Sequence, residues 1–312
     1  MLDFSNSKIL IVGDVMLDKY YFGKVDRISP EAPVPIVNIQ KEESRLGGAS
    51  NVANNIVSLG GHSLLCGVIG HDLFGKEIER ISRHKNIDTF LLKTSSPTIT
   101  KARIIGGKQQ IVRVDYEDKS ELNADNKKLF RDTISQILPE YDILVISDYG
   151  KGLISEDLCR YLIKLAHKYD KKVIIDPKGK NWEKYSGADI VTPNVKELSD
   201  IVGYTVPNTD RAIEKAAREA ITNNHLTALL VTRSDKGMSL IGPIPPIHIP
   251  THSEEVFDVS GAGDTVVATL GLCLAAGFEI SEAMRTANIA AGIVVKKVGT
   301  ATLTIEELVQ QK

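Results

Sequence analysis

Short apolar runs alternate with amphipathic segments along most of the chain. The first run, KILIVGDVML, is almost continuous Ile, Leu and Val up to Gly13 and Asp14, which is typical of a buried parallel strand. Further strands are predicted at 63–70, 142–147, 172–176, 189–192 and 228–232, and helices at 51–59, 125–138, 156–169, 194–202 and 210–223. This alternation predicts an α/β fold with a doubly wound, mostly parallel sheet, flanked by helices and binding ligands at the carboxyl ends of its strands.

Two segments interrupt this alternation. Residues 32–39, APVPIVNI, contain prolines that exclude a helix or a central strand, and residues 98–114 alternate on both sides of Gly106 and Gly107. The second segment therefore predicts a hairpin with a two-residue turn. We interpret both as parts of a small β lid, at about 20–45 and 97–117, beside the edge that binds ligands. No linker or repeat divides the chain, so residues 1–312 are expected to form a single domain carrying this lid.

Composition narrows the possible partners and location. The 312 residues are 42% hydrophobic and 25% charged with a net charge of -2, so no basic excess favours nucleic acid or an anionic membrane. No window approaches the ~18 apolar residues of a membrane span, and the N-terminus lacks the basic residues of a signal peptide. Cys66, Cys159 and Cys273 have neither disulfide-framework nor zinc-site spacing. We expect a cytoplasmic protein that binds small molecules.

The stretch DVSGAGD, residues 258–264, precedes a continuous apolar run. A helix can start at Ser260 or Gly261, and the free N–H groups at its start would form an anion site. Asp264 would take a proton from a hydroxyl that attacks a phosphoryl group, while the N–H groups of Gly261, Ala262 and Gly263 stabilise the developing charge. The alternative is a glycine-rich turn with Asp264 as an ordinary first-turn residue. Neither a P-loop nor a complete dinucleotide fingerprint is present, so an ATP site would have to be built in another way.

A second glycine motif precedes an early helix. In RLGGASNVANN, Gly47 and Gly48 come before Asn51. The GG-x-x-N and D-x-x-GAGD motifs together resemble the two signatures of the ribokinase-like (PfkB) family of carbohydrate kinases, in order and spacing over nearly the whole chain. The resemblance implies an ATP-dependent phosphotransferase that acts on an alcohol group.

Further segments narrow the resemblance within that family. SDYGKG, DPKG, TPNVKE and VTRSDKGMSL are similar to the branch that phosphorylates D-glycero-D-manno-heptose 7-phosphate at C1, on the route to the ADP-heptose of lipopolysaccharide core. Many of these relatives are fused to a nucleotidyltransferase domain. Because this chain stops at Lys312, we expect another protein to supply the adenylyl transfer.

The resemblance also implies roles for residues around the sugar. Asp14, Gly47, Gly48 and Asn51 would hold sugar hydroxyls, for which carboxylates and amides offer suitable donors and acceptors. A turn residue at the end of a strand is the alternative for Asp14, and a local cap or ion pair is the alternative for Asp18.

For the nucleotide, the resemblance implies that Asn194 and Glu197 organise Mg²⁺, largely through water. Thr232 and Gly237 would lie along the phosphates and ribose of ATP, and Asn288 would lie near the adenine. A helix N-cap is the alternative for Asn194, and both roles can hold together.

Two further nucleotide-side features follow from the resemblance. Arg233 would reach a phosphate of ATP, and a solvated arginine is the alternative. Many members of the family also bind a monovalent cation through backbone oxygens, which here would lie around Asp258 and residues 294–299. Potassium is therefore an additional candidate cofactor beside ATP and Mg²⁺.

Four cations are candidates for binding a phosphate on the sugar. Lys101, Arg103 and Arg113 alternate along the predicted hairpin, and Lys151 follows a predicted strand. Side chains two residues apart share one face of a strand, so Lys101 and Arg103 can face the same phosphate. Solvated charges that protect a strand edge are the alternative.

Several functional questions remain open at this level. The alternatives to a heptose-phosphate kinase are a ribokinase-like kinase of another sugar, sugar phosphate or nucleoside, and a non-catalytic sensor of nucleotides or sugar phosphates. Lids in this family often pair across subunits, so a homodimer through the lid is expected. The anomer of the product and any regulation are left open.

Overall fold

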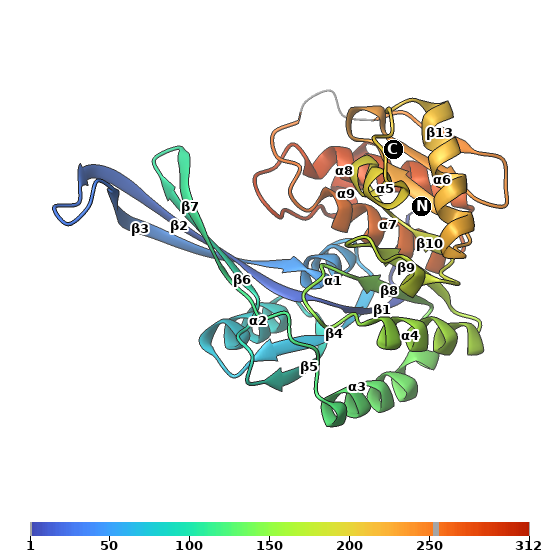
Figure 1. Ribbon diagram of the computed structural model, residues 1–312, viewed down its shortest axis with the longest axis horizontal. Coiled ribbons are helices and arrows are strands. Elements are labelled where there is room, and N and C mark those ends of the chain that lie inside the picture. The colour runs from blue at the N-terminus through green and yellow to red at the C-terminus, as the bar shows by residue number, and fades with distance from the viewer. Residues whose placement is uncertain (1, 252–255, 312) are drawn as a thin grey trace.

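The computed structural model describes residues 2–251 and 256–311, and these form a nine-stranded sheet and a four-stranded sheet. Figure 1 shows the large sheet inside a layered body and the small sheet projecting from that body as a long arm. The expected α/β fold is confirmed, and the arm lies where the sequence predicted the lid.

The large sheet has the strand order β13-β12-β11-β10-β9-β8-β1-β4-β5. The pairings from β11 through β5 are parallel, and β12 and β13 add two antiparallel pairings at one edge. Its strands are β1 (Lys8–Gly13), β4 (His62–Gly70), β5 (Asp88–Thr94), β8 (Ile143–Ser147), β9 (Lys172–Asp176), β10 (Ile190–Val191), β11 (Leu229–Thr232), β12 (Met238–Ile241) and β13 (Ile247–Ile249).

Helices cover both faces of this sheet. One face packs against α1 (Ala49–Ser58), α2 (Leu73–His84), α7 (Ala262–Ala275), α8 (Ile280–Val294) and α9 (Ile305–Gln310). The other face packs against α3 (Ala124–Ile137), α4 (Glu156–Lys168), α5 (Val195–Val202) and α6 (Asp210–Asn224). Strand β1 explains why both faces are buried: Ile9 and Ile11 enter the first core, and Leu10 and Val12 enter the second.

The arm is a sheet in the order β3-β2-β6-β7, built from β2 (Val15–Ile28), β3 (Pro35–Gly48), β6 (Thr100–Gly106) and β7 (Gln109–Tyr116). β2 begins one residue after Asp14, and β3 ends at the residue before α1. The root of the arm therefore lies at the carboxyl end of β1, where the fold predicts ligands. Pro35 opens an edge strand, as its missing N–H group requires.

The structure changes the sequence-based bounds in several places. The hairpin turn falls at Gly107 and Lys108, not at Gly106 and Gly107, because Gly107 takes the left-handed backbone (φ 65°) while Gly106 still pairs with Gly23. The first arm segment spans 15–48 instead of about 20–45. The sequence analysis did not anticipate α2, β5, β12 or β13. Strands as short as β12 and β13, of four and three residues, carry little periodic signal.

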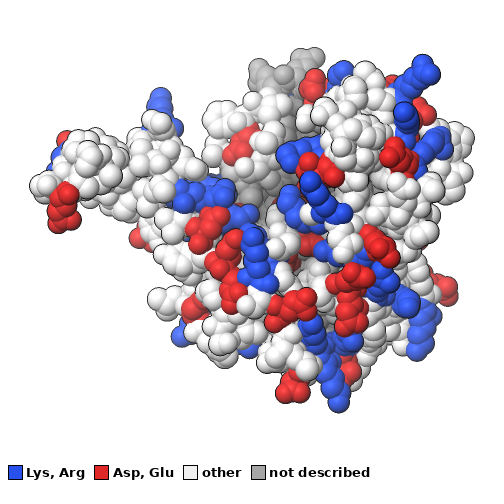
Figure 2. All heavy atoms as spheres, viewed as in Figure 1, with Lys and Arg blue, Asp and Glu red and all other residues white. Residues whose placement is uncertain are grey.

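Helix length, thiols and surface charge complete the description. Within the residues that the structure describes, none of the helices combines the length and the apolar content needed to cross a bilayer. Cys66, Cys159 and Cys273 are buried. Figure 2 shows Lys and Arg interspersed with Asp and Glu over the viewed face, including the region where the arm meets the body.

Candidate active site

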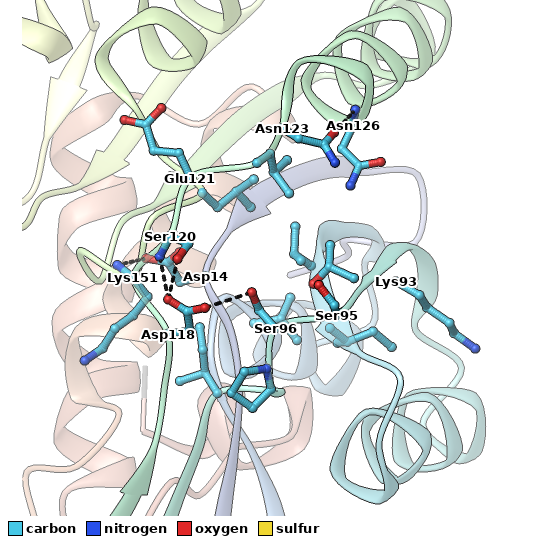
Figure 3. A pocket seen from close by; sticks show the side chains of 18 of the residues that line it. Asp14, Lys93, Ser95, Ser96, Asp118, Ser120, Glu121, Asn123, Asn126 and Lys151 are labelled. Atoms are coloured by element: carbon cyan, nitrogen blue, oxygen red, sulfur yellow. Dashed lines mark hydrogen bonds between the residues drawn. The ribbon is translucent and has the colours of Figure 1, made fainter.

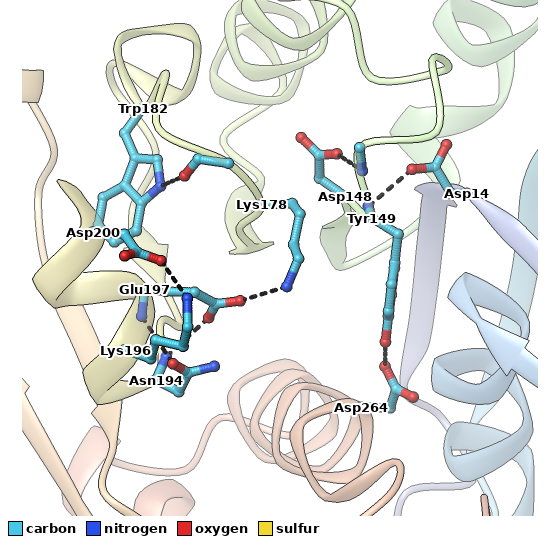
Figure 4. A network of polar contacts seen from close by, with 12 residues as sticks. Asp14, Asp148, Tyr149, Lys178, Trp182, Asn194, Lys196, Glu197, Asp200 and Asp264 are labelled. Carbon is cyan, nitrogen blue, oxygen red and sulfur yellow. Dashed lines mark hydrogen bonds and ion pairs between the residues drawn. The ribbon is translucent and has the colours of Figure 1, made fainter. Parts of the chain in front are cut away.

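Asp264 lies in the first turn of α7 and is 3% exposed. Its two carboxylate oxygens each accept one hydrogen bond from the protein. Nδ2 of Asn51, on α1, donates to Oδ2 over 2.7 Å, and the hydroxyl of Tyr149, in the loop after β8, donates to Oδ1 over 2.8 Å (Figure 4). Each oxygen keeps a second lone pair, so the carboxylate can still accept a proton from another group.

The environment of Asp264 tunes it for proton transfer. Burial raises the pKa of this carboxyl to about 6, against the lowering effect of the hydrogen bonds from Asn51 and Tyr149. The charge of Asp18 raises the pKa further and the charge of Lys101 lowers it. A base with a pKa near the working pH is the most effective one, so Asp264 has the properties that general-base catalysis requires.

The start of α7 supplies hydrogen-bond donors beside this carboxylate. Gly261 is the N-cap with φ 79°, and among the described residues no acceptor takes the N–H of Gly261 or Gly263. The N–H of Ala262 instead donates to the carbonyl of Val259 over 3.2 Å, so it is not free for an anion in this arrangement. Two of the three N–H groups that were predicted to bind an anion thus have no acceptor among the described residues.

The glycines before α1 are fixed by close approach to acidic residues. Gly48 caps α1 with φ 55°, and a Cβ there would lie 2.5 Å from the carbonyl oxygen of Asp14. A Cβ on Gly47 would lie 2.5 Å from Oδ2 of Asp18. Gly48 thus lets the chain pass close to the backbone of Asp14, and Gly47 lets it pass close to the carboxylate of Asp18.

Asp14 holds the loop after β8. Its Oδ2 accepts the N–H groups of Tyr149 (2.9 Å) and Lys151 (3.0 Å). Burial, and secondly the charge of Asp148, raise the pKa of Asp14 to about 6. Asp14 therefore positions the loop that carries Tyr149, and binding of sugar hydroxyls by its other oxygen stays a prediction.

Asp18 is a site residue that the sequence analysis left undecided. Its side chain is 7% exposed and forms an ion pair with Arg103 over 2.6 Å. It lies opposite Lys101 in the register of β2 and β6, and its charge acts on Asp264. The sequence carried little signal for this pairing, because it depends on the register between β2 and β6.

Lys101 and Arg103 are two residues apart on β6, so their side chains lie on the same face of the arm. The ammonium of Lys101 lies 5.5 Å from the centre of the Tyr149 ring, and no carboxylate among the described residues forms an ion pair with it. Burial is the main cause that lowers the pKa of Lys101. Arg103 pairs with Asp18 and lies over the ring of Tyr20 at 5.2 Å.

The other two predicted phosphate-binding cations have carboxylate partners. Arg113 forms a surface ion pair with Asp115 over 2.8 Å, and the ammonium of Lys151 pairs with Glu117. Lys101 is therefore the cation best placed to receive an additional anion, and binding of a phosphate by the four stays a prediction.

A cleft of ≈ 170 Å³ has Tyr149 in its lining. It brings together the predicted Asn194, Glu197 and Thr232 with Gly263 of the helix terminus. Its lining consists of Asp148, Tyr149, Asp176, Pro177, Lys178, Thr192, Asn194, Glu197, Thr232 and Gly263.

Asn194 and Glu197 form the capping box of α5. Oδ1 of Asn194 accepts the N–H of Glu197 over 2.9 Å, and Oε2 of Glu197 accepts the N–H of Asn194 over 3.1 Å. Oε1 of Glu197 pairs with Lys178 over 2.9 Å (Figure 4). The N-cap role of Asn194 is confirmed. Neither hydrogen bond of the capping box uses Nδ2 of Asn194.

Asp176 is a second residue that the sequence analysis did not assign. It ends β9 inside the cleft, where burial first, and then the charges of Asp264 and Glu197, raise its pKa well above the usual value. Carboxylate and amide oxygens are the ligand types that Mg²⁺ takes, usually with several waters. The donor set of Asp176, Asn194 and Glu197 therefore fits a magnesium ion.

Arg233 is not the solvated arginine of the alternative expectation, and its contact with a phosphate of ATP stays a prediction. The residue is 3% exposed, which excludes a solvated arginine. Its Nη1 donates to Asp210 (2.6 Å) and Ser239 (2.8 Å), and its Nε donates to Asn208 (2.9 Å). The guanidinium thus joins α6, β12 and the turn before α6, and it lies outside the lining of the cleft.

Gly237 and Asn288 also lie outside that lining. Gly237 (φ 77°) closes the turn after Thr232, and a Cβ there would lie 2.0 Å from the carbonyl oxygen of Ile249. Nδ2 of Asn288 donates to the carbonyl of Pro250 over 2.7 Å. Both therefore contact the backbone of residues 249–250, and their contacts with ATP stay predictions.

The segment suggested for potassium is held together by hydrogen bonds. Oδ2 of Asp258 accepts the N–H of Gly299 over 2.8 Å, and the carbonyl of Val295 accepts the N–H groups of Phe257 and Asp258. Arg45 donates to the carbonyl of Val298. These carbonyl oxygens already accept protein donors.

A further pocket is lined in part by Asp14. It measures ≈ 620 Å³ and is enclosed by the ends of β4 and β5 and by residues 118–126 (Figure 3). Asp14 and Lys151 line it, whereas Asp264 does not.

Comparisons with known proteins agree with this geometry. The model of the pfkB family of carbohydrate kinases matches residues 6–307. The chain is 46% identical over 308 residues, 98% of its length, to "Bifunctional protein HldE" of Haemophilus influenzae (strain PittEE), and 43% identical over 301 residues, 96% of its length, to the protein of the same name from a Nitratiruptor species. It spans 63% and 64% of those relatives.

Solved structures show the same fold. Phosphofructokinase-2 from Escherichia coli in complex with potassium superposes with a TM-score of 0.80 at 20% identity, covering 97% of each chain. Arabidopsis thaliana ribokinase complexed with ribose and ATP superposes with a TM-score of 0.76 at 19% identity, covering 98% of each chain. At these identities the likeness shows the fold alone.

Proposed function

Because the chain belongs to the pfkB family of carbohydrate kinases, which transfer phosphoryl groups to sugar hydroxyls, we propose that its substrate is D-glycero-D-manno-heptose 7-phosphate. The γ-phosphoryl group of ATP would pass to the C1 hydroxyl, giving the 1,7-bisphosphate for ADP-heptose and lipopolysaccharide core synthesis. One observation carries the proposal: a buried carboxylate with a pKa of about 6 lies at a helix N-terminus, between the cleft and the cations of the arm.

In the proposed reaction, Asp264 and the N–H groups at the start of α7 have separate roles. Asp264 accepts the proton of the C1 hydroxyl as that oxygen bonds to the γ-phosphorus. The bond from the γ-phosphorus to the bridging oxygen breaks, and ADP leaves with the bonding electrons. The N–H groups of Gly261 and Gly263 donate to the phosphoryl oxygens in the transition state. Most of the rate enhancement then comes from positioning and electrostatics.

ATP would lie over the cleft, with Thr232 beside its phosphates and with Gly237 and Asn288 supporting the nucleotide end. When Mg²⁺ is bound, it neutralises charge on the phosphate oxygens. Asn194, Glu197 and Asp176 would hold the ion, chiefly through water. Potassium beside Asp258 belongs to the proposal through the family resemblance, and a relative of the same fold has been solved in complex with potassium.

The sugar would lie between Asp14, Asp18 and Asn51, under the arm. Lys101, supported by Arg103, would bind the 7-phosphate, because Lys101 is a partly buried cation without an ion-pair partner among the described residues. The negatively charged oxygens of a phosphate would give this ammonium an ion-pair partner.

The test is ADP release with Mg-ATP and a panel of acceptors. We expect the heptose 7-phosphate to exceed ribose, fructose 6-phosphate and adenosine in kcat/KM by at least about 100-fold, the scale set by one well-made charged contact. Lys101→Met should raise KM for the heptose 7-phosphate, whereas Lys108→Met, in the exposed hairpin turn, should leave it unchanged.

The same panel separates the alternatives. A preference for another acceptor would keep the kinase and reject the heptose. Tight nucleotide or sugar-phosphate binding without any turnover would favour a non-catalytic sensor.

We also propose a homodimer through the arm and a cytoplasmic location, where ATP is available. The arm exposes a set of apolar side chains that includes Val25, Ile28, Val34, Ile39, Ile111, Val112 and Val114. Apolar surface gathered on one projecting element is typical of an interaction site. Light scattering should give twice the mass of one chain, and a monomer at all concentrations would reject the dimer.

A further inference from the structure

Tyr149 touches three parts of the active site at once. Its hydroxyl donates to Oδ1 of Asp264 over 2.8 Å, and its N–H donates to Oδ2 of Asp14 over 2.9 Å. The ammonium of Lys101 lies 5.5 Å from the centre of its ring. Figure 4 shows the side chain extended between the two carboxylates, with the hydroxyl directed at Asp264. Tyr149 also lines the cleft beside Asp176 and Gly263.

The loop that carries Tyr149 is itself rigidly held. Asp148, 2% exposed, accepts the N–H of Gly150 over 2.7 Å and the hydroxyl of Tyr185 over 2.7 Å, and it pairs with Lys184. Contacts on both flanks therefore fix the backbone of Tyr149, so its hydroxyl has a defined place from which to orient another group.

We propose that Tyr149 is a positioning residue for phosphoryl transfer: its hydroxyl orients the Asp264 carboxylate toward the acceptor hydroxyl, and its ring and N–H couple that carboxylate to Lys101 of the arm and to Asp14. The inference rests on the proposed kinase function for the step that is positioned. It assigns a role to the tyrosine of SDYGKG, a segment that the mechanism above does not use.

The electrostatics around the base support this role. Asp264 is faced by Asn51 from α1, Asp18 from β2, Lys101 from β6 and Asp176 from β9. Burial first, and then the charge of Asp264, raise the pKa of Tyr149 well above its usual value. The phenol therefore stays protonated and remains a donor. Its hydrogen bond lowers the pKa of Asp264 against the effect of burial.

Tyr149→Phe tests the proposal because it removes only the hydroxyl and keeps the ring under Lys101. Without that donor, we expect the pKa on the acidic limb of the pH profile of kcat to rise by about one unit. A shift of this size corresponds to the loss of one hydrogen bond to a charged group. We also expect kcat on the plateau to fall about tenfold, with KM for the heptose 7-phosphate within about twofold of wild type.

Tyr204→Phe is the matched control. It also removes a tyrosine hydroxyl that is hydrogen-bonded to a carboxylate, Glu219 at 3.0 Å, but on the surface and away from the site. This variant should keep the wild-type pH profile. If Tyr149→Phe kept it as well, Tyr149 would be only structural and the proposal would be overturned.

A second readout decides the inference even if the kinase assay fails. In protein labelled with ¹³C at the aspartate carboxyls, the resonance lost in Asp264→Asn identifies Asp264, and NMR follows its titration. We expect Tyr149→Phe to raise that pKa by about one unit. An unchanged pKa would overturn the role of Tyr149, whereas wild type without turnover on any acceptor would reject the proposed function alone.

Discussion

At the scale of single residues, the site is defined by carboxyl groups that the fold removes from water. The pKa values of Asp14 and Asp264 are both raised to about 6, in each case mainly by burial. The pKa of Asp176 is raised as well, and Asp264 and Glu197 lie close enough to add to that shift. Burying several carboxylates together costs stability, and a protein retains them where function requires the charge.

This arrangement predicts how stability depends on pH. The pKa of Asp264 in the folded protein, about 6, exceeds the ordinary 3.8, so the folded state binds the proton more tightly than the unfolded state. Its contribution to stability is fully present below pH 3.8 and is lost as pH rises through 6; a shift of about two units corresponds to ~3 kcal/mol. Asp264→Asn, measured by urea unfolding at pH 5 and pH 7, should therefore lose less stability across that interval than wild type. Equal losses in the two proteins would contradict the raised pKa.

The position of Asp264 in the first turn of a buried helix was predictable from sequence, whereas the partners of several residues were not. Small glycines before an aspartate and an apolar helix constrain the local backbone strongly. Arg233 gives no such local signal, because its partners Asn208 and Asp210 lie more than 20 residues earlier in the chain and Ser239 lies on the next strand, β12. Asp18 was undecided for the same reason, since its pairing with Arg103 depends on the register of β2 with β6.

At the scale of elements, α7 is the helix that carries the proposed base, Asp264. It is buried along most of its length, and a glycine with positive φ lies at each end: Gly261 at φ 79° and Gly277 at φ 80°. The surroundings of the two glycines differ. A Cβ on Gly261 would lie 2.8 Å from Nδ2 of Asn51, whereas a Cβ on Gly277 would meet nothing within 4 Å.

The two glycines form a matched pair of test sites. Gly261→Ala and Gly277→Ala should each lose ~1 kcal/mol of stability from left-handed strain, measured by urea unfolding. Only Gly261→Ala should displace Asn51 from Asp264, and we expect its kcat to fall at least about tenfold because the base loses an orienting hydrogen bond. Loss of kcat in both variants, or in neither, would argue against this contact.

Most elements of the body were predictable because β1, β4, β8, β9, β10 and β11 are short apolar runs that alternate with amphipathic helices. Strand β9 and helix α4 fall at the predicted bounds within one residue. The arm was harder to delimit. Only Asp14 separates the end of β1 from the start of β2, so the apolar pattern shows no break between the two strands.

At the scale of the whole molecule, the active site forms where the arm meets the body. Asp264 and the cleft belong to the body, whereas Asp18, Lys101 and Arg103 come from the arm. Tyr149 lies between the two groups and contacts both. The sequence predicted the lid and its cations, but only the folded chain shows that carboxylates already pair with Arg103, Arg113 and Lys151.

The most direct test of the central claim, that Asp264 is the catalytic base, is the kcat of Asp264→Asn against wild type with saturating Mg-ATP and heptose 7-phosphate. An amide cannot accept the proton of the attacking hydroxyl, so the account predicts a loss of at least about 1,000-fold in a variant that unfolds at a temperature similar to that of wild type. A variant that kept kcat within about tenfold of wild type would contradict it.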